Sequence, residues 1–391
     1  MLFLFHGRKA NIRSNNMKKL IVVGAGFWGC TIAERIASVL KQPVLVVERR
    51  AHIGGNSWST EDYETGIEVH QYGTHVFHTS DQAVWEYVSR FDSWNQYVHR
   101  VQAIWKGKKY QLPINLNTIE SFYGMQLDPQ TARKLIEQEA SRSGIICPRN
   151  FEEKIISMIG RPLYEAFFRG YTLKQWEKDP SELPLETAGR LPVRFNRNDS
   201  YFNDTWQGIP IHGYGAMFER MLNNPLITVR LSTDFSSLPE KDAPDSFVFY
   251  SGAIDQYFGW KLGRLEWRTC DFKLERLNIP DFQGVGEVNY LEESVKFTRI
   301  HEYRHYHPER KSPDKTIIAT EFSRACTPSD EPFYPVRTVD NLALYQRYRD
   351  LAEQVSDRII FGGRLGSYSY FDMDDTVFDA LETFHRMSAL R

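Results

Sequence analysis

The pattern of apolar positions predicts a parallel β-sheet at the start of the fold. Residues 19–23 (KLIVV) form a run that is apolar after its lysine, and a second run follows at residues 44–47 (VLVV). Between them, the apolar residues of segment 32–40 recur with the spacing of a helix. Strands of a parallel sheet are buried on both faces and therefore lack polar alternation. The order strand, helix, strand predicts the βαβ unit that begins a doubly wound sheet.

The middle of the chain changes to a helical pattern. Helical spacing runs through residues 129–142, 151–159 and 163–176, and Gly and Pro residues separate these segments. We therefore expect a helical insertion before residue 190.

Strand patterns dominate the remainder of the chain. Residues 262–272 and 285–290 have strand composition bounded by Gly, Pro and Asp, which predicts an antiparallel sheet that faces the substrate. Buried-strand composition returns in residues 227–231, 246–252 and 358–361, so we expect the first sheet to resume there. The predicted domains are therefore discontinuous in sequence.

Composition narrows the class of protein. A length of 391 residues predicts two to three domains. Hydrophobic residues at 41%, charged residues at 25% and a net charge of −2 describe a globular protein without the basic excess of a nucleic-acid surface, so we expect no nucleic-acid partner. The four cysteines lie far apart without a Cys-x-x-Cys pair, which favours a reducing cytoplasm over a disulfide framework. We expect no membrane span, because no apolar run reaches roughly 18 residues.

The first candidate for chemistry is a glycine pattern. Gly24, Gly26 and Gly29 have the spacing G-x-G-x-x-G, in which glycines permit a tight turn, the approach of backbone to a pyrophosphate and close helix–strand packing. A strand precedes the pattern, a helix follows it, and Glu48 ends the next strand, where its carboxylate can accept hydrogen bonds from ribose hydroxyls. We favour dinucleotide binding over a merely structural tight turn. Because Glu48 would repel a 2′-phosphate, FAD or NAD is expected rather than NADP.

Two further glycine pairs favour FAD. Gly54-Gly55 follows Glu48 closely, a pattern typical of the FAD family that includes amine oxidases, although a surface loop is the alternative. Gly362-Gly363, followed by Arg364, comes directly after an apolar strand and can present N–H groups to the other phosphate and the ribitol. Taken alone, Gly362-Gly363 is equally well explained as a glycine-rich turn between a strand and a helix. Together with the amino-terminal motif, it predicts one FAD held from both ends of the chain.

The predicted fold class is α/β, with a Rossmann-like FAD-binding domain, a helical insertion and an antiparallel β-sheet substrate domain. Residues 1–16 form an extension that we expect to be disordered and outside the fold. The FAD-binding domain is predicted over residues 17–80, 205–256 and 335–391, the helical domain over residues 81–96 and 114–190, and the antiparallel sheet domain over residues 97–113, 191–204 and 257–334.

Histidines occur near one another in the sequence without a familiar metal-binding spacing. His70, His75 and His78 lack a cysteine or carboxylate that would complete a site, so we predict no metal. The segment 73–78 is expected beside the isoalloxazine ring of the flavin, where Gly73 would let backbone approach the cofactor.

An aromatic stripe and several arginines leave two interpretations open. Helical offsets place four residues on one face, either as core or as a nucleobase site, namely Phe168, Tyr171, Thr172 and Trp176. The scattered arginines are surface cations unless a diphosphate substrate recruits two of them by bidentate hydrogen bonding; they are Arg190, Arg194, Arg299 and Arg337.

These motifs together resemble the bacterial UDP-galactopyranose mutase family over essentially residue 17 to the end. The resemblance rests on the glycine patterns, on segments 50–56, 72–78 and 191–195, on Gly170-Tyr171-Thr172-Leu173-Lys174-Gln175-Trp176, and on residues 361–365 and 370–373. The string in 170–176 is the specific part, because general FAD oxidoreductases do not carry it.

The resemblance implies an isomerase that interconverts UDP-galactopyranose and UDP-galactofuranose. In the family's mechanism, N5 of reduced FAD forms a covalent adduct with the anomeric carbon of galactose, UDP leaves and returns, and no net redox change occurs. It also implies that an external electron donor such as NAD(P)H reduces the FAD, that the protein is a homodimer, and that galactofuranose enters cell-surface polysaccharide.

The site residues follow from the same resemblance. The catalytic residues would be Arg190, Arg299 and His75, with Arg190 on a mobile loop. The substrate would be held by Phe167, Phe168, Tyr171, Thr172, Trp176, Arg190, Tyr201, Arg299, Tyr334 and Tyr370. The FAD would be held by Gly24, Gly26, Phe27, Gly29, Glu48, Arg49, Gly55, Asn56, Gly73, His75, Gly363, Arg364, Tyr370, Asp372 and Met373.

The sequence departs from the family pattern in two places, and two other functions are alternatives to a mutase. The first departure is the segment before Met17, and the second is His99, where some members have Asn. A FAD-dependent oxidase of the amine oxidase type would share the glycine motifs but would need an apolar tunnel and no diphosphate clamp. A noncatalytic flavin-binding scaffold would show no turnover of a sugar nucleotide.

Overall fold

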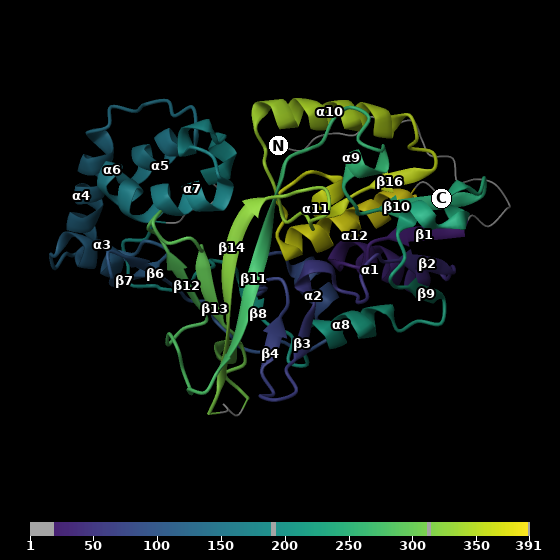
Figure 1. The fold of residues 1–391 in the computed structure, drawn as a ribbon, viewed down its shortest axis with the longest axis horizontal. Coiled ribbons are helices and arrows are strands. Elements are labelled where there is room, and N and C mark those ends of the chain that lie inside the picture. The colour runs from purple at the N-terminus through teal and green to yellow at the C-terminus, as the bar shows by residue number, and fades with distance from the viewer. Residues whose placement is uncertain (1–18, 189–192, 311–313, 390–391) are drawn as a thin grey trace.

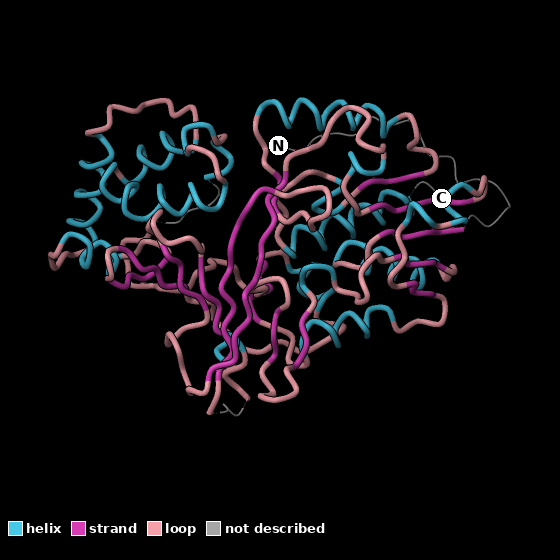
Figure 2. Tube along the Cα trace, viewed as in Figure 1, coloured by secondary structure: helices cyan, strands magenta, loops and turns pink. Residues whose placement is uncertain are grey.

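The structure, a computed structural model, describes residues 19–188, 193–310 and 314–389. Figure 1 shows a parallel sheet with its helices on one side of the molecule, a helical part on the other, and long antiparallel strands between them. In Figure 2 the magenta strands of the central sheet run between these two groups of cyan helices. In the parts of the chain described, no helix has both the length and the apolar character that crossing a bilayer requires.

A five-stranded parallel sheet organises the nucleotide-binding fold. Its order is β16-β10-β1-β2-β9. The strands are β1 (Lys19–Val23), β2 (Val44–Val47), β9 (Ile227–Arg230), β10 (Ser246–Tyr250) and β16 (Ile359–Phe361). From β1 the chain builds the sheet outward through β2 and β9, whereas β10 and β16 lie on the other side of β1. The order therefore reverses at β1, and such a reversal places a ligand crevice at the carboxyl ends of the strands.

Helices cover this sheet and carry both glycine motifs. Helix α1 (Phe27–Arg35) continues as a π-helical turn (Ile36–Leu40) and packs against α8 (Gly213–Leu222) and α12 (Met373–Ala389). The smaller helices are α9 (Ile254–Tyr257), α10 (Val339–Glu353) and α11 (Gly363–Gly366). Large side chains such as Trp28, Phe218, Phe247 and Phe249 fill the core between α1 and the sheet.

A seven-stranded sheet forms the centre of the molecule, in the order β15-β11-β14-β13-β12-β6-β7. The strands are β6 (Val101–Trp105), β7 (Lys108–Leu112), β11 (Trp267–Leu277), β12 (Glu287–Tyr290), β13 (Arg299–Glu302), β14 (Thr316–Ala325) and β15 (Tyr334–Pro335). The prediction of an antiparallel sheet is confirmed, with one addition: β12 pairs with β6 in parallel. Strand β11 begins at Trp267, five residues after the predicted start, because the chain before it turns through Gly263.

The helical part is built on the far edge of that sheet. It contains α3 (Leu116–Tyr123), α4 (Pro129–Ser141), α5 (Phe151–Ile159), α6 (Arg161–Tyr164) and α7 (Gly170–Trp176). Three of these helices start where a side chain accepts a backbone N–H, at Asn115, Asp128 and Asn150. The helices predicted over 129–142 and 151–159 are confirmed. The third predicted helix contains a π-helical turn at Glu165–Arg169, which the periodicity did not indicate.

Short elements connect these parts. Strands β3 (Ser59–Glu61) and β4 (Glu68–His70) form one hairpin-like pair, and β5 (Phe77–Thr79) pairs with β8 (Trp206–Gly208). Helix α2 (Gln82–Val88) lies beside α12 and β5. The segment after β4 passes between the cavity described below and the central sheet.

Candidate functional site

A cavity of about 460 Å³ lies at the point where the order of the parallel sheet reverses. Segments from both ends of the chain line it. The lining includes twelve of the residues predicted to hold the cofactor: Gly24, Gly26, Phe27, Glu48, Arg49, Gly55, Asn56, His75, Gly363, Arg364, Asp372 and Met373. The other three, Gly29, Gly73 and Tyr370, are not part of that lining.

Gly24 and Gly29 must be glycine for two different steric reasons. Gly24 has a φ of +92°, which favours glycine, and a Cβ there would lie 2.2 Å from the Ser251 hydroxyl. A Cβ at Gly29 would lie 1.9 Å from the carbonyl oxygen of Gly24, so only glycine lets α1 pack this closely on the turn. Gly29 therefore shapes the cavity from behind without lining it.

Glu48 fixes the turn and faces the cavity at the same time. Its carboxylate is 6% exposed, and its two oxygens accept the backbone N–H groups of Ala25 and Arg50, both at 2.8 Å. These bonds hold the glycine turn against the end of β2. A carboxylate oxygen has two acceptor positions, so the side chain retains capacity for ribose hydroxyls.

The carboxyl-terminal glycines are joined to the amino-terminal motif through α12. Asp379 accepts hydrogen bonds from the indole N–H of Trp28 at 2.8 Å and from the backbone N–H of Gly363 at 3.1 Å. Burial raises the pKa of Asp379 above its ordinary value. A Cβ at Gly362 would lie 2.2 Å from the Trp28 ring. Trp28 and Asp379 therefore fix the second glycine turn opposite the first.

The loop 73–75 forms the side of the cavity that faces the central sheet. Gly73 has a φ of +88°, and a Cβ there would lie 3.0 Å from the Phe272 ring. His75 Nδ1 lies 2.9 Å from the Gly73 carbonyl oxygen, so Nδ1 carries the proton and Nε2 is an acceptor. Burial lowers the pKa of His75 to about 4, and its imidazole is therefore neutral at pH 7. Its backbone N–H donates to Nδ1 of His70 at 3.0 Å.

Four charged side chains form a cluster on the sheet face that packs against this loop: Glu287, Arg299, His301 and Glu321. We call this set the buried charge cluster. Register pairs Glu287 with His301 and Arg299 with Glu321, so the four side chains lie next to one another on one face. Arg299 lies 3.0 Å from Glu287 and 3.3 Å from Glu321. Its side chain is 22% exposed, whereas His301 is fully buried.

The carboxylates of this cluster are held ionised by their neighbours. Burial alone would raise the pKa of Glu287 and Glu321, but Arg299 and His301 more than offset that effect and lower both. His99 Nε2 lies 3.8 Å from Glu287, and burial lowers the pKa of His99 to about 4. Sequence reasoning did not identify Glu287, His301 and Glu321. The sequence signal that could have identified them is the presence of ionisable residues among apolar ones within predicted strands.

Helix α7 is fixed against the loop between β12 and β13. A Cβ at Gly170 would lie 2.4 Å from the Leu291 carbonyl oxygen, so glycine permits the close approach. Lys174 Nζ donates to the carbonyls of Tyr290 and Phe297, the latter at 2.9 Å. Burial lowers the pKa of Lys174 to about 8. Lys174, which sequence reasoning did not assign, therefore positions the helix.

The predicted uridine residues divide between two environments. Tyr171 accepts a hydrogen bond from Arg299 through its hydroxyl, so it faces the buried charge cluster. Thr172 is 4% exposed, whereas Phe168 and Trp176 are half-buried. Phe167 is 4% exposed, and its ring packs on Tyr110 and Phe122 in the core of the helical part.

The predicted diphosphate tyrosines gather around Arg299. Tyr334 and Tyr370 stack with ring centroids 5.3 Å apart, and the guanidinium of Arg364 lies over both rings. Burial raises the pKa of Tyr201 and Tyr334, and the charge of Arg299 opposes that rise in each. Arg190 lies outside the described residues, and the structure does not place it. Arg194 is buried and donates to the carbonyl of Asn198, while Arg337 lies near Ser369.

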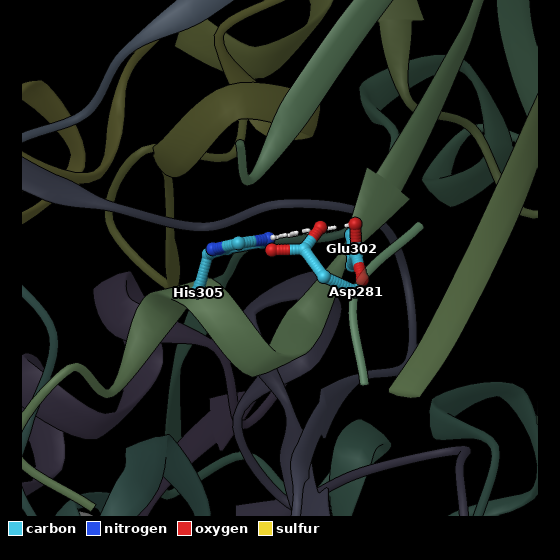
Figure 3. Close-up of side chains that lie close together, drawn as sticks. All are labelled: Asp281, Glu302 and His305. Carbon is cyan, nitrogen blue, oxygen red and sulfur yellow. Dashed lines mark ion pairs between the residues drawn. The ribbon is translucent and has the colours of Figure 1, made fainter. Parts of the chain in front are cut away.

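Possible metal ligands form two groups among the described residues, one away from the cavity and one that includes Asp372 of its lining. Figure 3 shows Asp281, Glu302 and His305, whose ligand atoms lie within 4.8 Å of one another. Both oxygens of Glu302 already accept backbone N–H groups, from Phe282 and Gln283 at 2.8 Å. Glu302 therefore holds the loop before β12. A second group consists of Asp372, Asp374 and Asp375 at the start of α12.

Comparison with known proteins gives the same organisation. A model of the family described as UDP-galactopyranose mutase matches residues 166–370, and one of an NAD(P)-binding Rossmann-like domain matches residues 22–91. The chain is 43% identical to a probable UDP-galactopyranose mutase of Klebsiella pneumoniae, covering 94% of both chains. It is 38% identical to a dTDP-fucopyranose mutase of Escherichia coli, covering 94% of this chain and 97% of that protein.

Solved structures agree at the level of the fold. A crystal structure of reduced UDP-galactopyranose mutase superposes with a TM-score of 0.75 at 18% identity, covering 96% of this chain and 95% of that one. Putrescine oxidase superposes with a TM-score of 0.57 at 12% identity, covering 95% of this chain and 99% of that one. These likenesses show that the chain shares the overall fold of these proteins. On the extent of its sequence similarity, the chain belongs to the UDP-galactopyranose mutase family, a family of isomerases.

Proposed function

We propose that this protein interconverts UDP-galactopyranose and UDP-galactofuranose with reduced FAD and without net redox change. The observation that carries the proposal is the position of Arg299. This partly exposed cation lies on the sheet face beside the loop that lines the cofactor cavity, and it is bonded to Tyr171 of α7. A nucleotide diphosphate seated there would contact both the helical part and the cavity.

The residues around the cavity fit FAD. The N–H groups of Gly24, Ala25 and Gly363 already have protein acceptors. The next N–H groups at the starts of α1 and α11 are those that would receive the two phosphates of a dinucleotide. Glu48 at the end of β2 suits an adenosine ribose with a free 2′-hydroxyl. When bound and reduced, FAD supplies the nucleophile for the anomeric carbon, at N5. The chain's own residues then bind, orient and shield the substrate.

Arg190 and Arg299 attract the diphosphate in this proposal, and Tyr201, Tyr334 and Tyr370 donate hydrogen bonds to it. A pair of arginines would stabilise the negative charge that UDP gains as it leaves. Phe168, Tyr171, Thr172 and Trp176 hold the uridine, and Phe167 supports them from the core of the helical part. His75, neutral at pH 7, offers its Nε2 lone pair toward the cavity that it lines.

The E. coli relative supports a second substrate. Its name states that it acts on a dTDP-linked fucopyranose, and its identity to this chain is close to that of the UDP-galactopyranose relative. dTDP-fucopyranose is therefore the comparison substrate. An amine oxidase activity is less favoured, because the buried charge cluster would lie where an apolar substrate needs an apolar tunnel.

The enzyme's partners complete the proposal. An external electron donor such as NAD(P)H would reduce the FAD, and the protein would act as a homodimer in the cytoplasm. The four cysteines are unpaired in the structure, which agrees with a reducing compartment. The furanose product would supply cell-surface polysaccharide.

Chromatography of sugar nucleotides tests the function. The purified protein is incubated with UDP-galactofuranose, with and without dithionite, and dTDP-fucofuranose is run in parallel. We expect conversion to UDP-galactopyranose only in the reduced sample. Conversion of the dTDP sugar alone would reassign the substrate, and no conversion of either by FAD-loaded, reduced protein would refute the mutase.

A further inference from the structure

His301 ends a chain of hydrogen bonds that begins at the Gly286 carbonyl. Because that carbonyl can only accept, the donor and acceptor of each bond in the chain can be assigned in turn. Tyr306 donates its hydroxyl proton to the Gly286 carbonyl at 3.0 Å, because a carbonyl only accepts. The Tyr306 oxygen therefore accepts the hydroxyl proton of Thr74, with which it is bonded. Thr74 has no second proton, so its oxygen accepts from Nδ1 of His301 at 2.5 Å. Nδ1 of His301 carries a proton.

The other ring nitrogen is protonated as well. Nε2 of His301 lies 3.0 Å from an oxygen of Glu321, an ionised carboxylate that can only accept. Both nitrogens are therefore donors, and His301 is an imidazolium. Burial alone would lower its pKa, but the hydrogen bonds and charges of Glu287 and Glu321 raise it above the ordinary value for histidine. The direction of the pKa agrees with the hydrogen bonds.

The protonated histidine balances the buried charge cluster. Glu287 and Glu321 carry two negative charges, and Arg299 and His301 carry two positive charges. Without the proton on His301, the two carboxylates would outweigh Arg299, and the cluster would be negative. Arg299 is the most exposed of the four side chains, so an incoming diphosphate meets the net field of the whole cluster there.

We propose that His301 is a positioning residue that offsets one buried carboxylate and so leaves the Arg299 guanidinium effective toward the diphosphate of the substrate. Glu321 contacts both Arg299 and His301, so the bond from His301 to Thr74 also connects Arg299, through Glu321, to the loop 73–75. This inference rests on the proposed function, because it concerns how the diphosphate is attracted.

Charge-balanced variants test the proposal in FAD-loaded protein by isothermal titration calorimetry with UDP. His301→Gln removes one positive charge, and we expect the UDP affinity to fall about tenfold, as for one charge acting through an effective dielectric near 20. Adding Glu287→Gln restores the balance, and the double variant should recover to within about threefold of wild type. The KM for the sugar nucleotide should follow the same order, with kcat changing less.

A matched histidine separates charge from packing. His307 also lies between two carboxylates, 2.6 Å from Glu68 and from Glu309, but these are not the carboxylates that contact Arg299. His307→Gln should leave UDP affinity at the wild-type value. A double variant as weak as His301→Gln would show that His301 acts by packing and would overturn the proposal, as would a His301→Gln variant with wild-type affinity.

Further measurements cover a variant that fails to accumulate and separate a failure of this inference from a failure of the proposed function. If His301→Gln does not accumulate with FAD, Glu287→Gln alone decides: the proposal predicts tighter UDP binding than wild type, and weaker binding overturns it. If wild-type protein neither binds UDP nor converts UDP-galactofuranose, the proposed function fails and this inference falls with it. If wild type does both and the variants do not follow the charge balance, only the inference fails.

Discussion

The indole N–H of Trp28 donates to the carboxylate of Asp379 at 2.8 Å, across 351 residues of sequence. The same carboxylate accepts the N–H of Gly363. Trp28 belongs to the first glycine turn and Gly363 to the second, so one side chain of α12 sets the distance between the two turns of the cofactor cavity.

Asp379→Ala should therefore weaken cofactor retention. It leaves the buried Trp28 N–H without an acceptor, which costs about 1–3 kcal/mol of unfolding free energy. The expected result is a lower ratio of flavin to protein after gel filtration and a lower Tm. Glu382→Gln on the same helix is the control, since the Glu382 side chain is about half exposed and lies 3.7 Å from His385. Full flavin content in Asp379→Ala would contradict the role given to this contact.

Glu48→Gln tests the ribose end of the cavity. The two oxygens of Glu48 each accept a backbone N–H, and an amide replaces one of these acceptors with a donor. We expect the affinity of the apoprotein for FAD to fall at least about tenfold, the effect of roughly 1.4 kcal/mol. Flavin fluorescence titration measures it, with Glu86→Gln on the exposed face of α2 as the control. An unchanged affinity would remove Glu48 from the cofactor site.

Lys174→Met tests the clamp on α7. We expect UDP affinity to fall several-fold while FAD stays bound, because α7 loses its bonds to the carbonyls of Tyr290 and Phe297. Calorimetry with UDP and the flavin spectrum measure the two effects. Arg169→Ala, one turn earlier and partly exposed, should leave both unchanged.

The pH dependence of stability gives Lys174 a second signature. Its pKa is about 8 in the folded protein, below the ordinary lysine value of 10.5. Between these values the unfolded chain binds the proton and the folded chain does not, so this group makes stability rise with pH from about 8 to 10.5. Denaturant unfolding at several pH values should show this rise in wild type and its loss in Lys174→Met. An identical slope in both proteins would argue against the buried ammonium.

The arginine predictions need different substitutions. Arg190→Ala should nearly abolish turnover while FAD remains bound.

Arg299→Ala would leave Glu287 and Glu321 buried without a guanidinium partner. Breaking a buried ion pair in this way lowers the free energy of unfolding by about 3–5 kcal/mol. Arg299→Lys keeps the charge and should fold, with turnover reduced at least about tenfold because bidentate geometry is lost. Near-normal turnover in Arg190→Ala or Arg299→Lys would contradict the role of that arginine in binding the diphosphate.

His75 should not titrate in the working range. Its pKa is about 4, so no change in activity between pH 6 and 8 should be assigned to it. His75→Asn should lower kcat while FAD and UDP still bind. A pH–rate profile that loses an ionisation near neutrality in this variant would contradict the neutral imidazole.

Sequence patterns predicted the parallel sheet and most of the residues that were proposed for the cofactor and that line the cavity, because glycine spacing and apolar runs depend on local backbone geometry. They did not predict the buried charge cluster, since Glu287 and His301 meet only through the pairing of β12 with β13. The role of Lys174 was also hidden, because its partners are backbone carbonyls of another segment. The register of distant strands and contacts to main chain leave little trace in one sequence.

The interleaving of the chain has a consequence for biosynthesis. The first glycine turn leaves the ribosome more than 300 residues before the strand, turn and helix that face it, which lie within residues 359–389. A nascent chain therefore cannot enclose the flavin until these residues have been synthesised. A stop codon between the two motifs should yield colourless protein even though the first glycine motif is intact.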